Sequence, residues 1–409
     1  MRLLRITSAY PEYAARFYAA HPGLAECGYS EQCTAYFHDA FSWADAWTVA
    51  LRPAGYEMRE TVLNVAPMQQ AWARENLRRT AQGDLETIAV EQIRQFAPEI
   101  LWYDHHDARL LKRIREAVPE TRLVIGWTGS AMPTQNAYTL CDLVLSCSRE
   151  SVERLTAMGH RAVELHHGFD PRIPARLGAA RADLDMVFIG QLIRGSQFHI
   201  EREKLLEQAV AALPLRIFSP SPHAAAPSPS RRMAKQALAA SYRLMNAAGG
   251  GALAARMLRA AGRSEEWLAP AQAAVNPKLV PHMSDGVYGL RMYETVRDAK
   301  ITLNVHADSS DRYASNMRLF EVTGVASCLL TDWKPNLGEM FAIDKEVVAY
   351  RSIAECIEKG RWLLEHPAER RAIAAAGQAR TLREHTFGHR AARFDAIVRQ
   401  ALQSMAVPG

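Results

Sequence analysis

Four polar residues near the C-terminal end of the chain, Ser315, Asn316, Arg318 and Glu321, have the types and spacing needed to bind a phosphorylated ligand. A helix that begins at Ser315 can be capped by this hydroxyl, which leaves the next backbone amides free for a phosphate at the positive end of the helix dipole. Arg318 adds a guanidinium fork for a diphosphate, and Glu321 can accept both hydroxyls of a ribose. The segment therefore predicts a nucleotide pocket. A simpler interpretation stays open, in which Arg318 and Glu321 pair with each other on a solvated face.

The segments on either side of these residues are predicted to be buried strands. Residues 300–305 (KITLNV) form a compact apolar run, and residues 328–332 (CLLTD) follow the end of the predicted helix at Gly324. The order strand, polar loop, helix, strand indicates a parallel crossover, and ligands bind where such strands end. His306, directly after the first strand, and Tyr313, in the loop, are therefore further candidates for ligand binding.

A second polar turn follows the predicted strand in residues 99–107 (EILWYDHHD). Because open α/β sheets place their active sites at the carboxyl ends of strands, Asp104 and His105 are candidates for a general base. A solvated surface turn is the alternative for any one of these residues.

Aromatic residues are dense between positions 30 and 47, where His38 and Asp39 lie among them. A loop of this composition can bind a sugar, since aromatic faces and carboxylates suit carbohydrate. An aromatic core cluster explains the rings equally well and is favoured for them, whereas His38 and Asp39 remain candidates for the base.

Strands alternate with helices along the chain, which predicts an α/β protein with two Rossmann-like, doubly wound parallel sheets. No glycine fingerprint follows the first strand at residues 2–7, so a dinucleotide-binding start is disfavoured. In the second half, Gly190 and Arg194 lie between a strand and a long helix, where a loop can face a phosphate. The predicted parts are a first domain at 1–170, a hinge linker at 171–184, a second domain at 185–388 and a final helix at 389–409 that crosses back to the first domain.

An insert interrupts the second domain at about residues 221–282. Its part from 221 to 264 holds seven Lys or Arg and no acid, and its helical spacing predicts a basic hairpin of two helices. Such a hairpin can lie on an anionic membrane or contact an acceptor. A helical cover packed on the second domain is the alternative.

The composition is that of an ordinary globular protein of 409 residues, with 48% hydrophobic and 23% charged residues. The net charge of +5 suits a phosphorylated ligand or an anionic surface but is too small for a nucleic-acid-binding face. No segment has the length of a membrane span or the form of a signal peptide, which favours a cytoplasmic location. The spacing of the six cysteines matches no zinc pattern, so free thiols and no bound metal are expected.

Several motifs in the second half resemble the CgeB-like (spore maturation protein) glycosyltransferases of GT-B fold. The matching residues are 289–306 (GLRMYETVRDAKITLNVH), 316–332 (NMRLFEVTGVASCLLTD), 346–378 and 384–390 (EHTFGHR). The first half matches more loosely, through residues 143–159 and 165–171 (LHHGFDP). The resemblance covers most of the chain and leaves the basic insert outside.

The resemblance implies GT-B architecture, with a cleft between the two domains, and transfer of a sugar from a nucleotide-linked donor without a bound metal. Glu321 takes the ribose-binding role in this comparison, Arg318, Asn316 and the loop from Gly190 to Arg194 face the diphosphate, and the turn that contains Tyr288 touches the base. No separate cofactor is implied beyond a UDP-, GDP- or dTDP-linked donor. Relatives often carry a second Glu near the donor sugar, where this chain has Tyr313 with Asp308 and Asp311 nearby.

The acceptor is open at this stage: a glycan, a lipid-linked glycan, a protein and a small molecule all fit, whereas nucleic acid does not. Two other functions remain compatible with the sequence. A nucleotide-sugar epimerase of GT-B fold needs the same pocket but no acceptor, and a non-catalytic GT-B-derived protein binds nucleotide weakly or not at all.

Overall fold

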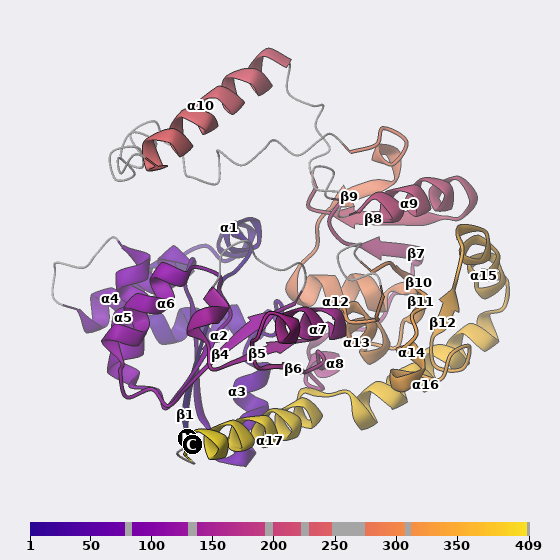
Figure 1. Ribbon diagram of the computed structural model, residues 1–409. Helices are drawn as coiled ribbons and strands as arrows, with labels where there is room; N and C mark the ends of the chain where they lie inside the picture. Colours follow the sequence, from indigo (N-terminus) through magenta and orange to yellow (C-terminus); the bar gives the residue numbers. More distant parts are fainter. Residues whose placement is uncertain are drawn as a thin grey trace.

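The computed structural model describes residues 1–77, 84–129, 137–192, 199–221, 229–247, 275–306 and 312–406. Within them the chain forms two six-stranded sheets, each entirely parallel and each covered by helices (Figure 1). The predicted fold class, α/β with two doubly wound parallel sheets, is confirmed.

The first sheet has the strand order β2-β1-β3-β4-β5-β6. Its strands are β1 (Arg2–Thr7), β2 (Glu57–Val62), β3 (Ile100–Tyr103), β4 (Leu123–Thr128), β5 (Leu143–Ser146) and β6 (Ala162–Glu164). Its helices are α1 (Pro11–Ala20), η1 (Leu24–Glu26), α2 (Tyr29–His38), α3 (Ala46–Leu51), η2 (Arg52–Ala54), α4 (Ala66–Asn76), α5 (Leu85–Phe96), α6 (Ala108–Ala117), η4 (Ala137–Leu140) and α7 (Arg149–Ala157).

The second sheet has the order β12-β11-β10-β7-β8-β9. Its strands are β7 (Leu184–Ile189), β8 (Leu215–Ser219), β9 (Met283–Asp285), β10 (Ala299–Asn304), β11 (Cys328–Asp332) and β12 (Val348–Tyr350). The helices are α8 (Ile173–Arg176), α9 (Ile200–Ala212), α10 (Pro229–Ala247), η6 (Val280–His282), α12 (Gly289–Arg297), α13 (Arg318–Gly324), α14 (Leu337–Met340), α15 (Ile353–Glu365), α16 (Pro367–Glu384) and α17 (Phe387–Ala406).

The strand sequences are apolar because both faces of each sheet are covered. Every residue of β3 and β4 is buried, for example. The turn after β3 ends in a capped helix: the Asp107 carboxylate accepts hydrogen bonds from the amides of Arg109 and Leu110 at the start of α6. This cap fixes the conformation of the polar turn that holds Asp104 and His105.

Both sheets reverse their strand order at one point, and the two points face each other. The reversal lies between β1 and β3 in the first sheet and between β7 and β10 in the second. Open α/β sheets bind ligands beyond the carboxyl ends of the strands at such points. Thr7 ends β1 and Asp104 follows β3, while Gly190 follows β7 and Val305 follows β10, so these residues come to one cleft.

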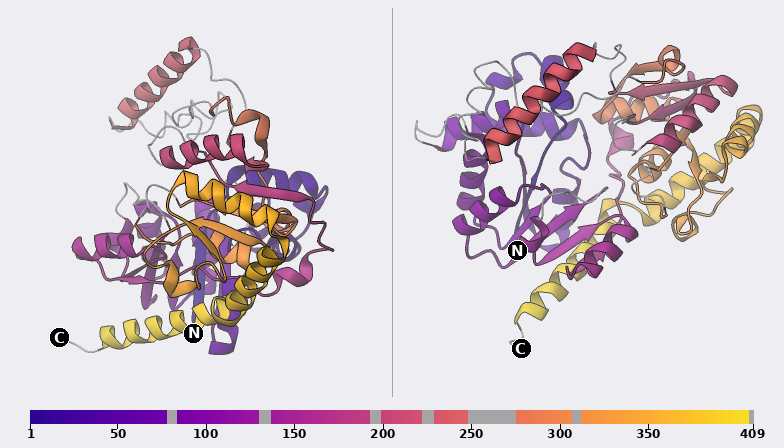
Figure 2. Two further views of the ribbon diagram at one scale, coloured as in Figure 1. Left: turned by 90° about the vertical axis from the view of Figure 1, so that its right-hand side faces the viewer. Right: turned by 45° about the horizontal axis from the view of Figure 1, so that its top comes forward.

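Helix α17 joins the two halves of the molecule. It leaves the second domain after α16 and runs along the first (Figures 1 and 2). The Phe394 ring stacks on Trp102 with centroids 4.9 Å apart, and the Tyr56 hydroxyl donates to Asp395 Oδ1 over 2.8 Å. The hydrophobic core of the first domain is therefore completed by the C-terminal helix.

One predicted local structure is wrong, and another is described only in part. The aromatic stretch 30–47 is not an open loop, because α2 occupies its first part with Gln32 and Tyr36 buried one helical turn apart. The rings of Trp43 and Trp47 pack in the core, as the favoured alternative predicted. Of the predicted basic hairpin, α10 is present, and the second helix lies outside the described residues.

Candidate functional site

A cleft of about 840 Å³ lies between the two domains at the carboxyl ends of both sheets. It is lined on the first-domain side by residues that include Thr7, Ser8, Trp43, Asp104, His105, His106, Trp127 and His167. On the second-domain side the lining includes Gly190, His199, Arg202, Tyr288, Met292, Asn304, Asn316, Arg318 and Glu321. Seven predicted site residues thus meet in one place: Asp104, His105, Gly190, Tyr288, Asn316, Arg318 and Glu321.

Arg318 and Glu321 form an ion pair in the cleft. Both belong to the first turn of α13, and Arg318 Nη1 lies 2.9 Å from Glu321 Oε2. The pairing of the simpler interpretation therefore exists, but its solvated face does not, because both side chains are largely buried. The Tyr293 hydroxyl lies 3.5 Å from Glu321 Oε1, and Met292 Sδ lies 2.7 Å from Arg318 Nη1. The second domain thus places an ion pair in the cleft, and Met292 and Tyr293 contact its two side chains.

Ser315 does not cap a helix, contrary to the prediction. Helix α13 begins only at Arg318, and its N-cap residue Met317 forms no side-chain cap. The cause lies in the tertiary structure, since the Asn336 side chain binds both the amide and the carbonyl of Ala314, over 2.7 and 3.0 Å. The chain is held in a non-helical conformation up to this point, so Ser315 is buried ahead of the helix.

Asn316 reaches the cleft with its side-chain amide already hydrogen bonded. Its Nδ2 donates to Asn304 Oδ1 over 2.7 Å, and Asn304 in turn donates to Thr331 Oγ1 over 2.9 Å. These bonds attach the start of α13 to the ends of β10 and β11. Asn316 is therefore a fixed part of the cleft wall.

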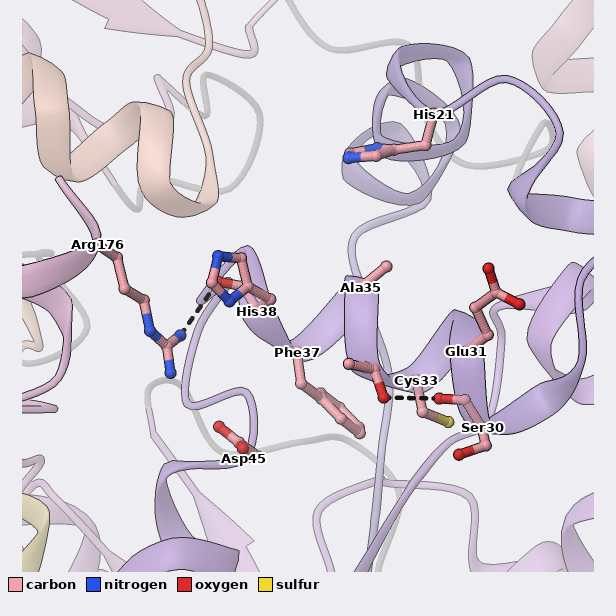
Figure 3. A pocket seen from close by; sticks show the side chains of 10 residues that line it. His21, Ser30, Glu31, Cys33, Ala35, Phe37, His38, Asp45 and Arg176 are labelled. Atoms are coloured by element: carbon pink, nitrogen blue, oxygen red, sulfur yellow. Dashed lines mark hydrogen bonds between the residues drawn. The ribbon is translucent and has the colours of Figure 1, made fainter. Parts of the chain in front are cut away.

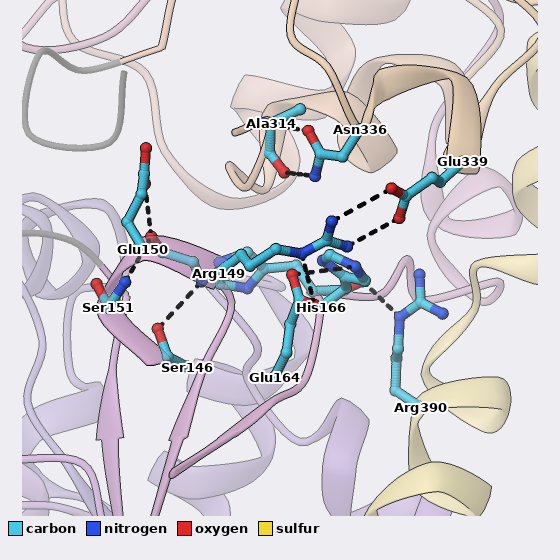
Figure 4. A network of polar contacts seen from close by, with 12 residues as sticks. Ser146, Arg149, Glu150, Ser151, Glu164, His166, Ala314, Asn336, Glu339 and Arg390 are labelled. Carbon is cyan, nitrogen blue, oxygen red and sulfur yellow. Dashed lines mark hydrogen bonds and ion pairs between the residues drawn. The ribbon is translucent and has the colours of Figure 1, made fainter. Parts of the chain in front are cut away.

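The structure places Tyr313 and His306 outside the lining of the cleft. The Tyr313 amide donates to Glu150 Oε1 over 3.2 Å, and the Arg149 guanidinium lies 5.1 Å from the centre of its ring, so Tyr313 belongs to a contact between the domains. Figure 4 shows Arg149 and Glu150 on the first-domain side, with Ala314, Asn336 and Glu339 of the second domain nearby. The His306 side chain is buried, with Nδ1 2.7 Å from Asp332 Oδ1, an interaction that holds the pKa of Asp332 well below its usual range against the effect of burial.

Asp104 and His105 are the two candidate bases that reach the cleft. Thr7 Oγ1 donates to Asp104 Oδ2 over 3.1 Å, and burial raises the pKa of Asp104 to about 6, although Arg5 and Thr7 act in the opposite direction. His105 Nδ1 lies 3.3 Å from Ser8 Oγ, and burial lowers the pKa of His105. A carboxylate with a raised pKa is suited to take a proton near neutral pH.

The other two candidate bases, His38 and Asp39, lie elsewhere. His38 is exposed at the end of α2 and lines a separate hollow of about 750 Å³, where its carbonyl accepts a hydrogen bond from Arg176 (Figure 3). The Asp39 carboxylate accepts from the Tyr13 hydroxyl over 2.8 Å and from the amide of Leu290 in the second domain. Burial is the main cause that raises the pKa of Asp39. Asp39 thus connects the domains rather than lining the cleft.

Several cleft residues were not predicted from the sequence, among them Arg202, His199 and His167. Arg202 is buried in α9 and donates to the carbonyls of Gln191 over 3.0 Å and Val305 over 2.8 Å, next to His199. His167, in the segment that joins the domains, lies against Trp43. The only sequence signal for Arg202 was its place in the helix after β7. Predicted Arg194, Asp308 and Asp311 lie outside the described residues.

Neither a metal site nor a membrane-spanning helix is present in the described part of the chain. No group of three or more His, Cys, Asp or Glu there has the geometry of a metal site. The same residues contain no helix with the length and apolarity required to cross a membrane. All six cysteines are free, as predicted.

Comparison with known proteins bears on the second domain and on the fold. A family model described as "Glycosyl transferase-like" matches residues 253–396, which is less than half of the chain but contains Asn316, Arg318 and Glu321. Among curated proteins, no sequence matches this chain.

Three solved structures resemble the whole chain. A glycosyltransferase from Rickettsia africae has a TM-score of 0.51 and 8% identity over 98% of each chain. HepE from Anabaena, in complex with UDP and glucose, has a TM-score of 0.51 and 10% identity over 98% of this chain and 100% of its own. AviGT4, a glycosyltransferase involved in avilamycin A biosynthesis, has a TM-score of 0.50 and 13% identity over 99% and 98%. At these identities the likeness establishes the two-domain GT-B fold.

Proposed function

We propose that the chain is a glycosyltransferase that moves a sugar from a nucleotide-linked donor to a hydroxyl group of an acceptor, without a bound metal. The observation that carries the proposal is the meeting of two chemistries in one cleft: the Arg318–Glu321 pair on α13 faces the Asp104 carboxylate at the end of β3. The resemblance of the sequence to CgeB-like glycosyltransferases, the match of the second domain to a glycosyl transferase-like family and the GT-B fold all support it.

The second domain binds the nucleotide in this proposal. Glu321 accepts the ribose hydroxyls once a ligand draws Arg318 toward the diphosphate, and Asn316 and Gly190 contribute polar groups beside it. Arg202 adds a second cation at the end of β7 and β10. Tyr288, at the start of α12, contacts the base.

The chemical step requires a base and stabilisation of a leaving charge. Asp104 takes the proton of the acceptor hydroxyl, while the oxygen of that hydroxyl forms a bond to the anomeric carbon of the donor sugar. The bond from this carbon to the diphosphate breaks, and the electron pair stays on the phosphate oxygen. Arg318 and Arg202, fixed before the reaction, stabilise that charge. Asp104 is preferred to His105 because burial brings its pKa to about 6, whereas burial makes His105 a weaker base.

The first experiment is binding and turnover with UDP-, GDP- and dTDP-linked sugars and the free diphosphates, in the presence of EDTA. A ligand that prefers the native state raises the melting temperature, so one diphosphate should give a clear shift. Glu321→Ala and Arg318→Ala should abolish that shift, while Glu358→Ala, on the outer helix α15, should retain it. If no diphosphate stabilised the protein, the glycosyltransferase proposal would be wrong, and conversion of the donor sugar without an acceptor would establish an epimerase instead.

The same proposal places the protein in the cytoplasm, with α10 in contact with the inner face of the cell membrane and a lipid-linked glycan as one candidate acceptor. On α10, Met233 is 69% and Leu244 72% exposed. Residues 229–247 hold four Lys or Arg and no acid. Apolar side chains and positive charge on one helix suit an anionic bilayer surface.

Sedimentation with vesicles tests this contact. The protein should bind phosphatidylglycerol vesicles more tightly than phosphatidylcholine vesicles, and salt should weaken the binding. Met233→Ser with Leu244→Ser should release it, whereas Met158→Ser, a 58% exposed methionine on the first domain, should not. Equal binding by all variants would exclude α10 as the membrane contact.

A further inference from the structure

His167 lies in the cleft and has no role in the proposed chemistry so far. It follows β6 in the segment that joins the domains, and its side chain is 94% buried, since only 6% of the residue surface is exposed. The rings of Trp43 and Trp127 each have their centres 5.6 Å from the imidazole, and all three rings line the cleft. The first domain therefore offers an aromatic wall with one imidazole in it.

The backbone at His167 is held on the opposite side by α17. Its carbonyl accepts a hydrogen bond from Arg390 Nε over 2.8 Å. Two residues later, the amide of Phe169 donates to the carbonyl of His385, and the Phe387 amide donates back to Phe169, over 2.8 and 2.9 Å. The imidazole is thus positioned by the main chain and has little freedom to turn away from the cleft.

Trp43 fixes the tautomer of this imidazole. Its indole Nε1 donates to His167 Nδ1 over 3.1 Å, and an indole N–H can only donate, so Nδ1 carries no hydrogen. Burial, with His166 and Arg390 nearby, lowers the pKa of His167 to about 3, so the ring is neutral at physiological pH. The single ring hydrogen is therefore on Nε2.

The Nε2 hydrogen has no acceptor in the described part of the chain. Nε2 is also not one of the enclosed polar atoms there, so it is open to the cleft that the ring lines. A largely buried donor without an acceptor is unfavourable and is expected to find one in a ligand. His167 therefore differs from the other cleft residues in that its uncharged imidazole can donate one hydrogen bond, from Nε2, in a fixed direction into the cleft.

We propose that His167 determines specificity for the donor by donating a hydrogen bond from Nε2 to a hydroxyl of the transferred sugar. This inference rests on the proposed function. A neutral ring with one hydrogen suits a hydroxyl, whereas a phosphate favours the cations of the second domain. The neighbouring rings of Trp43 and Trp127 suit the apolar face of a pyranose.

The place of His167 in the fold favours the transferred sugar over the acceptor. Two residues further along the chain, the Phe169 ring packs directly against Gly324 at the end of α13, the helix that holds Arg318 and Glu321. The imidazole therefore enters the cleft from the side on which the first domain meets α13. The sugar attached to a diphosphate beside Arg318 is the first hydroxyl-bearing group on that side.

Calorimetric binding of UDP-glucose and UDP tests the proposal, with the GDP and dTDP pairs used instead if one of them stabilises the wild-type protein. His167→Ala should weaken binding of the nucleotide sugar roughly three- to tenfold, the value of one hydrogen bond, and leave binding of the diphosphate within about twofold. His166→Ala, the matched change in the neighbouring imidazole outside the cleft lining, should alter neither. Equal losses for sugar and diphosphate, or no loss, would overturn the proposal, as would a loss seen only in the KM of the acceptor.

Two further measurements keep the test valid if His167→Ala is unstable. Nitrogen NMR of the wild-type protein should show the neutral ring with hydrogen on Nε2, and a hydrogen on Nδ1 would contradict the proposal. Trp43→Phe removes the bond that fixes this tautomer and should reproduce the selective loss of sugar binding with His167 intact. If the wild-type protein binds no diphosphate at all, the proposed function is wrong. If the wild-type protein binds both the diphosphate and the nucleotide sugar, and the variants show no selective loss of sugar binding, only the proposal for His167 is wrong.

Discussion

The two walls of the cleft are built from opposite chemistry. On the second-domain wall, Arg318 and Glu321 hold two opposite charges 2.9 Å apart. On the first-domain wall, Trp43 and Trp127 contribute rings, and His167 adds one neutral donor beside them. A charged wall can stabilise a diphosphate, whereas an aromatic wall suits a sugar. The difference implies a division of work, in which the second domain recognises the nucleotide and the first recognises what is transferred.

Asp104 lies on the first-domain wall and is the proposed base of the chemical step. Its substitution is predicted to have the largest effect on turnover. Asp104→Asn removes the base but keeps the shape and the hydrogen bond from Thr7, so turnover should fall roughly a hundred- to ten-thousandfold while nucleotide binding stays unchanged. In the wild-type protein the base works only when deprotonated. Turnover should therefore rise with pH through the pKa of about 6 and be level above it.

Steady-state rates between pH 5 and 9, with a donor identified by thermal shift, would measure both effects. Asp107→Asn is the matched control, because this carboxylate in the same turn caps α6 and does not line the cleft. It should leave turnover nearly unchanged. Substantial activity in Asp104→Asn, lost instead in His105→Ala, would move the base to the neighbouring residue.

The charged wall was predictable from the sequence because it is local. Asn316, Arg318 and Glu321 lie close together in the sequence, between two short apolar runs. Both runs were predicted to be buried strands, and both are strands in the structure. The aromatic wall was not predictable, since Trp43, Trp127 and His167 come from three distant segments and meet only after the first sheet has formed.

The wrong predictions, like the correct ones, were made from local sequence patterns. Ser315 has the local signature of a cap, but the distant side chain of Asn336 binds the backbone of the preceding residue, and the helix begins only at Arg318. Asp39 lies in an aromatic stretch that suggested a binding loop, yet its carboxylate binds Tyr13 of the first domain and the amide of Leu290 of the second. In each case a contact that is remote in sequence overrode a local pattern, and no local pattern contains that information.

The contact between Asp39 and the start of α12 gives the second prediction, because it joins the two walls. Gly289 has φ of +54°, and a Cβ there would collide with the Asp39 carboxylate. Gly289→Ala should therefore lower the free energy of unfolding by about 1–3 kcal/mol through strain and overpacking. It should also weaken nucleotide binding, since Gly286 to Gly289 line the cleft.

Thermal denaturation with and without the diphosphate measures both effects. Gly338→Ala is the matched control, because a Cβ at Gly338 meets nothing within 4 Å and the residue lies in a short helix away from the cleft. It should be neutral or slightly stabilising. If the two alanine variants behaved alike, the joint between the walls would not depend on this close approach.

The smallest effect is expected at the rim, where Arg149 of the first domain binds Glu339 of the second over 2.8 and 3.3 Å (Figure 4). Glu339 is 58% exposed, so a double-mutant cycle should give a coupling below about 1 kcal/mol that weakens with salt. The hydrogen bond from Arg149 lowers the pKa of Glu339. The coupling should thus be complete above the pKa of an unfolded Glu, about 4.3, and disappear as pH falls through the lower native value.

A second ion pair, within one helix, serves as a control that separates an effect on stability from an effect on nucleotide affinity. Arg399 and Asp395 of α17 also pair over 2.8 Å, with the arginine rather than the acid as the more exposed partner, but neither contacts the second domain through this bond. Breaking either pair should change unfolding by a similar small amount, whereas only Arg149→Ala should lower nucleotide affinity, because only that pair crosses between the walls. Equal nucleotide affinities in Arg149→Ala and Arg399→Ala would show that the other contacts between the domains, such as those of Asp39 and α17, hold the walls together without the rim pair, which would then have no functional role.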